Sequence, residues 1–183
     1  MDIVEITSTG NDVEIDLVYA TERNFTGKPL YRTATCQLHR DALEALDRAV
    51  ELASALDLRI RIYDALRPSE VQWKLWADLP NPEYVTDPRR GSPHSRGIAI
   101  DLTLVDRDGE VLNMGTEFDD FTPLSHHGNL HVGIEIQRNR ALLLGIMTSA
   151  GWDFYRNEWW HYQLFNSRSY KLLFDCDLPS PML

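Results

Sequence analysis

The period of hydrophobic and polar positions changes along the chain, and each change marks an expected element. Within residues 40–57 the apolar side chains at helical spacing are Leu43, Leu46, Val50, Ala53 and Leu56. This spacing predicts an amphipathic helix with one face on a core. Over residues 58–67 Leu58, Ile60 and Ile62 alternate with polar neighbours, which is typical of a half-buried strand.

Pro68 predicts the end of that strand at Arg67, because the residue before a proline avoids the helical conformation. It also predicts the start of a helix over residues 69–79, where Val71, Leu75 and Leu79 share one side and two tryptophans add bulk. Residues 80–93 contain four prolines and are expected to form a loop.

The second half of the chain returns to a period of two. In residues 97–105 four apolar residues should face one way, which leaves Asp101 on the opposite face. The Asp108-Gly109 pair predicts a hairpin turn with a return strand over residues 110–114. The elements expected after it are a polar loop over 115–129, a helix over 136–150 stopped by Gly151, with Leu143, Ile146 and Met147 in the core, and an aromatic strand over 158–166.

These elements predict an α+β fold with a mainly antiparallel sheet backed by helices. A chain of 183 residues with 43% hydrophobic residues suits one domain, over residues 1–183. The net charge of −10 disfavours nucleic acid and anionic membranes as partners. Short apolar runs and an N-terminus without a signal pattern lead us to expect a soluble, cytoplasmic protein. Cys36 and Cys176 form no disulfide framework.

The segment SPHSRGIAID, residues 92–101, contains the first candidate chemistry. In one extended strand His94 and Asp101 would lie on the order of 23 Å apart, at roughly 3.3 Å per residue. A reversal near Gly97, which lacks a Cβ atom, would let both face one point. A histidine and a carboxylate that meet in this way suggest a metal site, and a catalytic zinc needs a third protein ligand and an open fourth position.

Candidates for a third ligand are His126, His127, His131 and His161. His161 stands out because Glu158 precedes it by three residues, and a glutamate near a metal-activated water can accept its proton. On a regular strand these two positions face opposite sides, so either Glu158 precedes the strand in a turn or bulge, or the pairing is accidental. The alternative is that the neighbouring aromatic residues are core and Glu158 is a solvated charge.

Several of these segments together resemble a known family. YATERNFTGKPLY, YDALRP, SPHSRGIAID and EWWHYQLFNSRSYKLL are similar to segments of the zinc-dependent D-alanyl-D-alanine dipeptidases, which include the vancomycin-resistance dipeptidase. The resemblance runs over residues 12–174. The wider group also contains D-Ala-D-Ala carboxypeptidases, phage peptidoglycan peptidases and the hedgehog domain. Its pattern is met here by Ser92, His94, Gly97, Ala99, Asp101, Glu158 and His161.

The resemblance implies a hedgehog-like D,D-peptidase fold and one Zn²⁺ per chain, bound by His94, Asp101 and His161. It implies that Glu158 is the general base and that Arg67 stabilises the tetrahedral oxyanion, a role that suits a permanently charged guanidinium. The chain departs from many relatives at Leu66, where they have tyrosine, and this change could alter the pocket wall.

The resemblance also implies the substrate contacts. Asp119 could hold the ammonium group of a dipeptide with the help of Tyr19, and Ser92 could face its carboxylate. The alternative is that these residues are a solvated loop acid, a core tyrosine and a turn serine. His126 and His127 are expected to be lid or surface residues rather than ligands.

The expected reaction is hydrolysis of D-Ala-D-Ala, a small D,D-dipeptide, to two D-alanines. One alternative is a D,D-carboxypeptidase acting on longer peptidoglycan peptides. The other is a zinc-stabilised binding domain without catalysis, which would need neither Glu158 nor Arg67. The sequence leaves open the oligomeric state and the choice among antibiotic resistance, nutrient salvage and wall recycling.

Overall fold

Two sheets organise the chain in the computed structural model, which describes residues 2–183. The larger has the order β2-β4-β5-β7-β6, and only its β2–β4 pair is parallel. Its strands are β2 (Val13–Ile15), β4 (Arg59–Asp64), β5 (Ala99–Val105), β6 (Asp153–Phe154) and β7 (His161–Gln163). Strands β1 (Ile3–Glu5) and β3 (Gln37–His39) pair antiparallel in the smaller sheet. The predicted α+β fold with a mainly antiparallel sheet is therefore confirmed.

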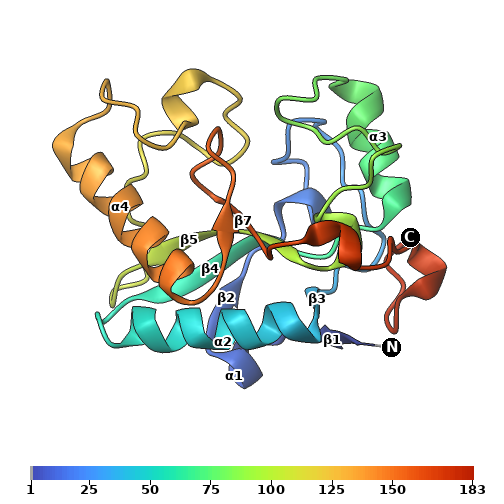
Figure 1. The fold of residues 1–183 in the computed structure, drawn as a ribbon, viewed down its shortest axis with the longest axis horizontal. Helices are drawn as coiled ribbons and strands as arrows, with labels where there is room; N and C mark the ends of the chain where they lie inside the picture. The colour runs from blue at the N-terminus through green and yellow to red at the C-terminus, as the bar shows by residue number, and fades with distance from the viewer. Residues whose placement is uncertain (1) are drawn as a thin grey trace.

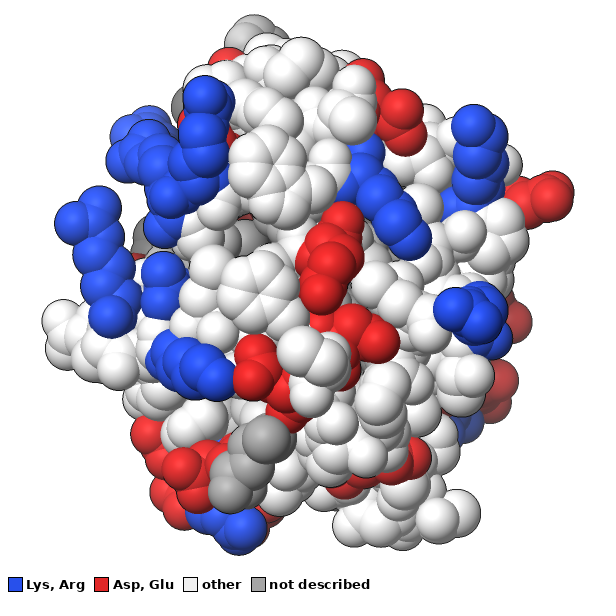
Figure 2. Space-filling model, turned by 90° about the vertical axis from the view of Figure 1, so that its right-hand side faces the viewer, with Lys and Arg blue, Asp and Glu red and all other residues white. Residues whose placement is uncertain are grey.

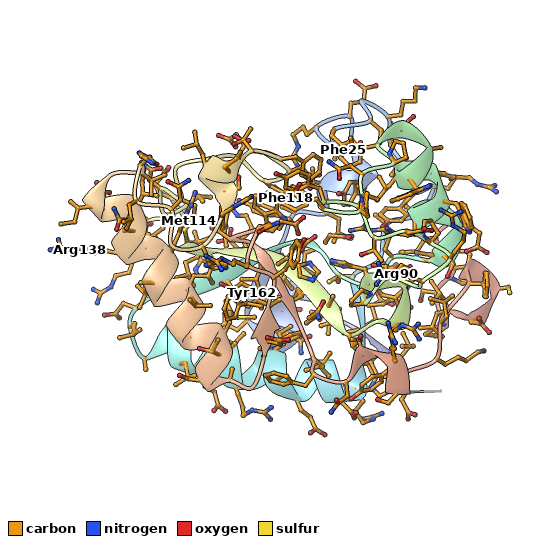
Figure 3. The ribbon with its side chains drawn as sticks, turned by 45° about the horizontal axis from the view of Figure 1, so that its top comes forward. Phe25, Arg90, Met114, Phe118, Arg138 and Tyr162 are labelled. Atoms are coloured by element: carbon orange, nitrogen blue, oxygen red, sulfur yellow. The ribbon has the colours of Figure 1, made fainter. Side chains whose placement is uncertain are left out.

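The helices lie on both sides of the larger sheet. They are α1 (Ser8–Asn11), α2 (Arg40–Ser54), α3 (Ser69–Asp78) and α4 (Ile134–Ser149). Helices α2 and α4 pack together with the apolar face of β4 and β5 in the main core, while α3 and the long loops rise on the other side (Figure 1). Phe25 and Phe118 lie among these loops, on the opposite side of the sheet from α2 (Figure 3), and both rings contact Tyr19.

Helix α2 differs from its prediction in length and in the centre of its buried face. Its fully buried residues are Ala42, Ala45, Leu46, Ala49 and Ala53, whereas Leu43 and Val50 are half-buried. The face of α2 that packs on the core is therefore centred on these alanines, one position away from the large apolar residues Leu43 and Val50. The helix ends at Ser54 because Asp57 adopts a left-handed conformation and the Leu58 N–H donates to Ala53 O. Leu56 therefore lies outside the helix and is exposed.

The strand expected over residues 58–67 is confirmed but ends at Asp64. Ile60 and Ile62 are buried as predicted. The register with β5 is irregular between Ile62 and Asp64, because Ile62 lies opposite Leu102 and Asp64 lies opposite Asp101. One extra residue, Tyr63, is thus accommodated in a bulge.

The prediction of a return strand over residues 110–114 is wrong. The turn at Asp108-Gly109 is present, but the returning segment makes a single bridge, Val105 to Val111, and then leaves the sheet. Helix α3 is confirmed, although Trp73 faces outward and is exposed. Helix α4 is also confirmed, with its three predicted core residues buried and Gly151 at a φ of 103° after its end.

The surface carries charges of both signs. Figure 2 shows one face on which Lys and Arg side chains are most numerous on the left, with others on the right, and a band of Asp and Glu side chains runs between them. The net negative charge is therefore not a uniform acidic surface. Within residues 2–183 there is no helix with the length and apolar character that crossing a membrane would require. Cys36 is buried, Cys176 is exposed, and both are free thiols.

Candidate metal and catalytic site

The register of the larger sheet aligns three polar residues at one edge of the pocket. On β5, Asp101 lies opposite Asp64 of β4 on one side and opposite His161 of β7 on the other. Residues directly opposite each other in a sheet project from the same face. The bulge at Tyr63 is required for this, since a regular register would place Tyr63 opposite Asp101.

His94 reaches the same point from the short helix η2 (His94–Arg96). That helix ends at Gly97, whose φ of 68° makes the predicted reversal. A side chain at Gly97 would be strained and would crowd Leu66 and the His39 backbone. The imidazole is buried, and its Nδ1 lies 2.7 Å from Ala65 O. This contact favours a proton on Nδ1, which leaves the Nε2 lone pair facing the site.

His161 is oriented by the equivalent contact from its other nitrogen. Its Nε2 lies 3.2 Å from Gln163 Oε1, so the Nδ1 lone pair faces inward when Nε2 is protonated. Nδ1 lies 3.0 Å from Asp101 Oδ1 and 3.1 Å from His94 Nε2, and His94 Nε2 lies 3.4 Å from Asp101 Oδ2. One ligand atom from each of the three residues lies within 4.8 Å of the other two.

This donor set fits a divalent metal ion. Two imidazole lone pairs and a carboxylate face one point, while the outer nitrogen of each ring is already paired with an oxygen atom. Two histidines and one carboxylate form a known type of three-ligand catalytic zinc site, and ring nitrogens oriented through outer hydrogen bonds accompany such sites. Burial opposes the charge on Asp101, but the two histidines hold its pKa below the usual range.

Glu158 lies in the turn before β7 and not in the strand. Its carboxylate is buried and comes within 4.0 Å of His161 Nδ1. The turn removes the strand alternation that would have placed the two residues on opposite faces. Burial raises the pKa of Glu158 well above its usual value, and Asp101 and Asp119 add to the effect. The interpretation of Glu158 as a solvated charge is therefore wrong. The other part of that alternative, that the neighbouring aromatic residues belong to the core, is confirmed for Trp159 and Trp160.

Arg67 follows β4 and is buried beside the same cluster. Its Nε and Nη2 donate to Asp64 Oδ2 at 2.9 and 2.8 Å, and its Nη1 donates to Gln72 Oε1 at 2.9 Å. Burial disfavours its charge, but Asp64, together with Tyr19, Tyr31 and Asp101, more than offsets burial and raises the pKa of the guanidinium. Three of its five N–H groups are occupied, and Nη2 lies 3.9 Å from Asp101 Oδ2. The remaining donors are thus available close to the metal ligands.

Asp119 and Tyr19 meet although they are far apart in the sequence. The Tyr19 hydroxyl donates to Asp119 Oδ2 at 2.9 Å, and the Arg67 guanidinium lies 4.8 Å above the Tyr19 ring. Asp119 has a φ of 61°, a conformation that the surrounding loop must enforce on a residue other than glycine. Burial and the nearby Asp101 raise the pKa of Asp119 to about 8. Ser92 is buried, and its Oγ accepts from the His94 N–H at 3.2 Å.

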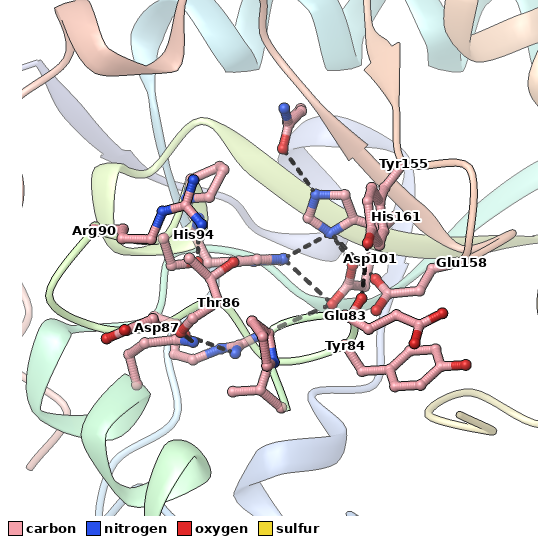
Figure 4. Close-up of a pocket in the computed structure, with 18 of the residues that line it drawn as sticks. Glu83, Tyr84, Thr86, Asp87, Arg90, His94, Asp101, Tyr155, Glu158 and His161 are labelled. Carbon is pink, nitrogen blue, oxygen red and sulfur yellow. Dashed lines mark hydrogen bonds and ion pairs between the residues drawn. The ribbon is translucent and has the colours of Figure 1, made fainter. Parts of the chain in front are cut away.

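All eight sequence-predicted site residues line one cavity of about 330 Å³. Figure 4 shows His94, Asp101 and His161 converging in it, with Glu158 at their side. A cavity of this size is at the lower end for small-molecule sites and fits a ligand no larger than a short peptide. The structure therefore brings together the residues that the family resemblance selected.

Sequence reasoning missed the residues that hold this site in place. Asp64 lies within the quoted YDALRP segment, yet nothing local showed that it would bind Arg67. Gln163 lies two residues after His161 on the same strand, a spacing that does predict a shared face. His126 and His127 do not belong to the metal-binding group. His127 is half-buried and packs against Phe154 and Tyr162.

The α+β fold and the residues grouped in this cavity define a metallopeptidase, a hydrolase of peptide bonds. A family profile described as D-ala-D-ala dipeptidase matches residues 1–176. The chain belongs to this family. It is 45% identical to the D-alanyl-D-alanine dipeptidase of Escherichia coli, over 95% of this chain and 90% of the relative. It is 35% identical to the protein of that name from Enterococcus faecalis, over 84% and 87% of the two chains.

Proposed function

We propose that this protein hydrolyses the free dipeptide D-Ala-D-Ala to two molecules of D-alanine. The observation that carries the proposal is the placement of a three-ligand cluster, a buried glutamate and a buried arginine in one small cavity, with Asp119 and Tyr19 in its wall. The relatives that carry the name D-alanyl-D-alanine dipeptidase support the choice of substrate.

The proposed metal is one Zn²⁺ per chain, held by His94, Asp101 and His161. A zinc ion in such a site lowers the pKa of water to about 7 and polarises a carbonyl group. A non-catalytic zinc-stabilised domain is less well supported, since a structural site has four protein ligands and no need of a glutamate beside it.

Glu158 is the proposed general base. Its position 4.0 Å from His161 Nδ1 places it beside the atoms that would hold the metal, and its burial favours proton acceptance over solvation. It accepts a proton from the water that adds to the peptide carbonyl carbon. It then returns the proton to the nitrogen of the leaving D-alanine as the C–N bond breaks.

Arg67 is the proposed stabiliser of the tetrahedral intermediate. Asp64 fixes two of its donors and Gln72 a third, so the unoccupied donors have a defined direction before substrate arrives. A donor that is already oriented stabilises developing oxyanion charge without paying a reorganisation cost during the reaction.

Asp119, with Tyr19, is the proposed ligand of the substrate ammonium group. Acylation of that amine would leave a half-buried carboxylate without its cation and would add bulk beside the aromatic rings packed around Tyr19. This favours a dipeptidase over a carboxypeptidase of longer peptides. Ser92 is proposed to contact the substrate carboxylate. We further propose a cytoplasmic protein without nucleic-acid or membrane partners.

The test is hydrolysis by the zinc-loaded protein of D-Ala-D-Ala, of the L,D- and L,L-dipeptides, and of acetyl-Lys-D-Ala-D-Ala. We expect cleavage of free D-Ala-D-Ala and at least about a hundredfold lower kcat/KM for the acylated peptide. Asp119→Ala should reduce the difference in kcat/KM between the two substrates, because it lowers kcat/KM for the free dipeptide much more than for the acylated peptide. Equal kcat/KM for the free and acylated substrates in the parent would favour the carboxypeptidase, and no cleavage of any D,D-peptide would exclude both enzymes.

A further inference from the structure

The charged side chains that line the cavity are divided between two sides. In Figure 4, Arg90 lies on the opposite side of His94 from Glu158, whereas Glu83 lies on the same side as Glu158. Asp119 also lines the cavity and was assigned above to the ammonium group. No group of the substrate has yet been assigned to Arg90.

The side chains of the consecutive residues Arg89 and Arg90, in the turn before Ser92, have different surroundings. The Arg90 N–H donates to Asp87 O at 2.9 Å and the Gly91 N–H donates to Pro88 O at 3.1 Å, while Gly91 has a φ of 76°. Arg89 turns back to Asp87, with Nε and Nη2 contacts of 2.8 and 2.7 Å. Arg90 instead lines the cavity, which Arg89 does not.

The Arg90 guanidinium has no counter-ion within residues 2–183. It makes no hydrogen bond and no ion pair with that part of the chain, and its neighbour Asp87 is already bound by Arg89. Arginine stays protonated, and its planar group binds a carboxylate through two parallel hydrogen bonds. A free carboxylate in the cavity would supply the missing partner.

We infer that Arg90 binds the C-terminal carboxylate of the substrate and thereby sets the requirement for a free C-terminus. The inference rests on the proposed function. An extended dipeptide carries its two charges roughly 7 Å apart at opposite ends, so Asp119 and Arg90, which both line the cavity, would each contact a different end. Ser92, two residues from Arg90, can add a hydroxyl donor to the same carboxylate.

The experiment compares D-Ala-D-Ala with D-alanyl-D-alaninamide, which lacks the carboxylate charge, in the zinc-loaded parent and in Arg90→Gln. We expect Arg90→Gln to raise KM for D-Ala-D-Ala at least about tenfold with little change in kcat, because the lost contact binds ground state and transition state alike. The amide should be cleaved by both proteins with similar kcat/KM. Arg90→Lys should recover part of the preference for D-Ala-D-Ala over the amide, since lysine keeps the positive charge but lacks the planar guanidinium group.

Arg89→Gln is the matched control, because it removes an adjacent exposed arginine that does not line the cavity. It should leave both substrates unaffected. If the parent cleaves D-Ala-D-Ala and Arg90→Gln keeps the parental ratio of kcat/KM for D-Ala-D-Ala to kcat/KM for the amide, the inference is overturned while the proposed function stands. Arg168 also lines the cavity and makes no side-chain hydrogen bond or ion pair with residues 2–183, so a loss found only in Arg168→Gln also overturns the inference. A parent inactive on D-Ala-D-Ala overturns the proposed function and the inference with it.

Discussion

His94 Nε2 lies 3.1 Å from His161 Nδ1, and the outer nitrogen of each ring lies within hydrogen-bond distance of an oxygen atom. When the outer nitrogen of each ring carries the proton, the two inner lone pairs face each other and repel unless a cation lies near both. Asp101 adds a negative charge at the same point. The fold therefore holds three metal-ligand groups together at a cost that a bound metal ion would offset.

The first prediction concerns these ligands. His94→Ala, Asp101→Ala and His161→Ala should each bind much less zinc than the parent, because two ligands remain of three. Metal analysis after dialysis and thermal unfolding with and without zinc would measure the loss. His131→Ala, which removes an exposed histidine, should keep parental zinc content. Full occupancy in His161→Ala would exclude His161 as a ligand.

The second prediction concerns the contact between Gln163 and the outer nitrogen of His161. Gln163→Ala should weaken zinc binding about 10- to 100-fold, because the ring loses the partner that fixes its orientation. Competition with a chelator would give the dissociation constant. Gln137→Ala on α4 is the control, and equal affinity in Gln163→Ala and Gln137→Ala would show that the contact does not orient the ligand.

The third prediction separates proton transfer from metal binding. Glu158→Gln should retain zinc and lose roughly two to four orders of magnitude in kcat, because the amide cannot accept the proton. Steady-state kinetics on D-Ala-D-Ala with parallel metal analysis would test it. Glu51→Gln, on the exposed face of α2, should keep parental kcat. Parental turnover in Glu158→Gln would rule out this residue as the base.

The fourth prediction concerns the fixed geometry of Arg67. Arg67→Lys keeps a positive charge but cannot reproduce the paired contacts with Asp64 or the contact with Gln72. We expect it to bind zinc normally and to lose about 10²- to 10³-fold in kcat, the usual effect of removing an oriented donor. An unchanged kcat would mean that charge alone, without orientation, supports the reaction.

The fifth prediction concerns Arg140, a buried residue of α4 outside the cavity. Its Nε donates to Met114 O and its Nη1 to Leu124 O, both at 2.7 Å, so it ties together the two ends of the loop that carries Asp119. Arg140→Gln should raise KM for D-Ala-D-Ala and reduce the preference over the acylated peptide, because Asp119 loses its enforced position. Zinc content should stay parental.

Arg138→Gln is the control for Arg140→Gln. Arg138 lies on the same helix with its side chain directed away from the molecule (Figure 3). The Arg140 variant should also lose about 1–3 kcal/mol of stability for each backbone carbonyl left unpaired. Arg140→Lys, which can still reach one carbonyl, should recover part of the substrate preference. If Arg140→Gln lowers the free energy of unfolding but leaves the preference for D-Ala-D-Ala over the acylated peptide unchanged, Arg140 has a structural role only.

The sequence by itself determined the elements and residues that depend on local information. The period of apolar positions predicted α2, β4, α3 and α4, since the face of a helix or strand follows from spacing alone. The reversal at Gly97 follows from a residue without a Cβ atom. The family pattern selected eight site residues, all of which line the cavity.

The tertiary structure decided what depends on pairing between distant segments. Tyr63 forms a bulge only because β4 must match β5, and that bulge brings Asp64 opposite Asp101. The loop carrying Asp119 takes its position from Arg140 on a helix that follows it in the chain. Strand register and the satisfaction of buried polar groups are properties of the whole packed chain, so no local pattern contains them.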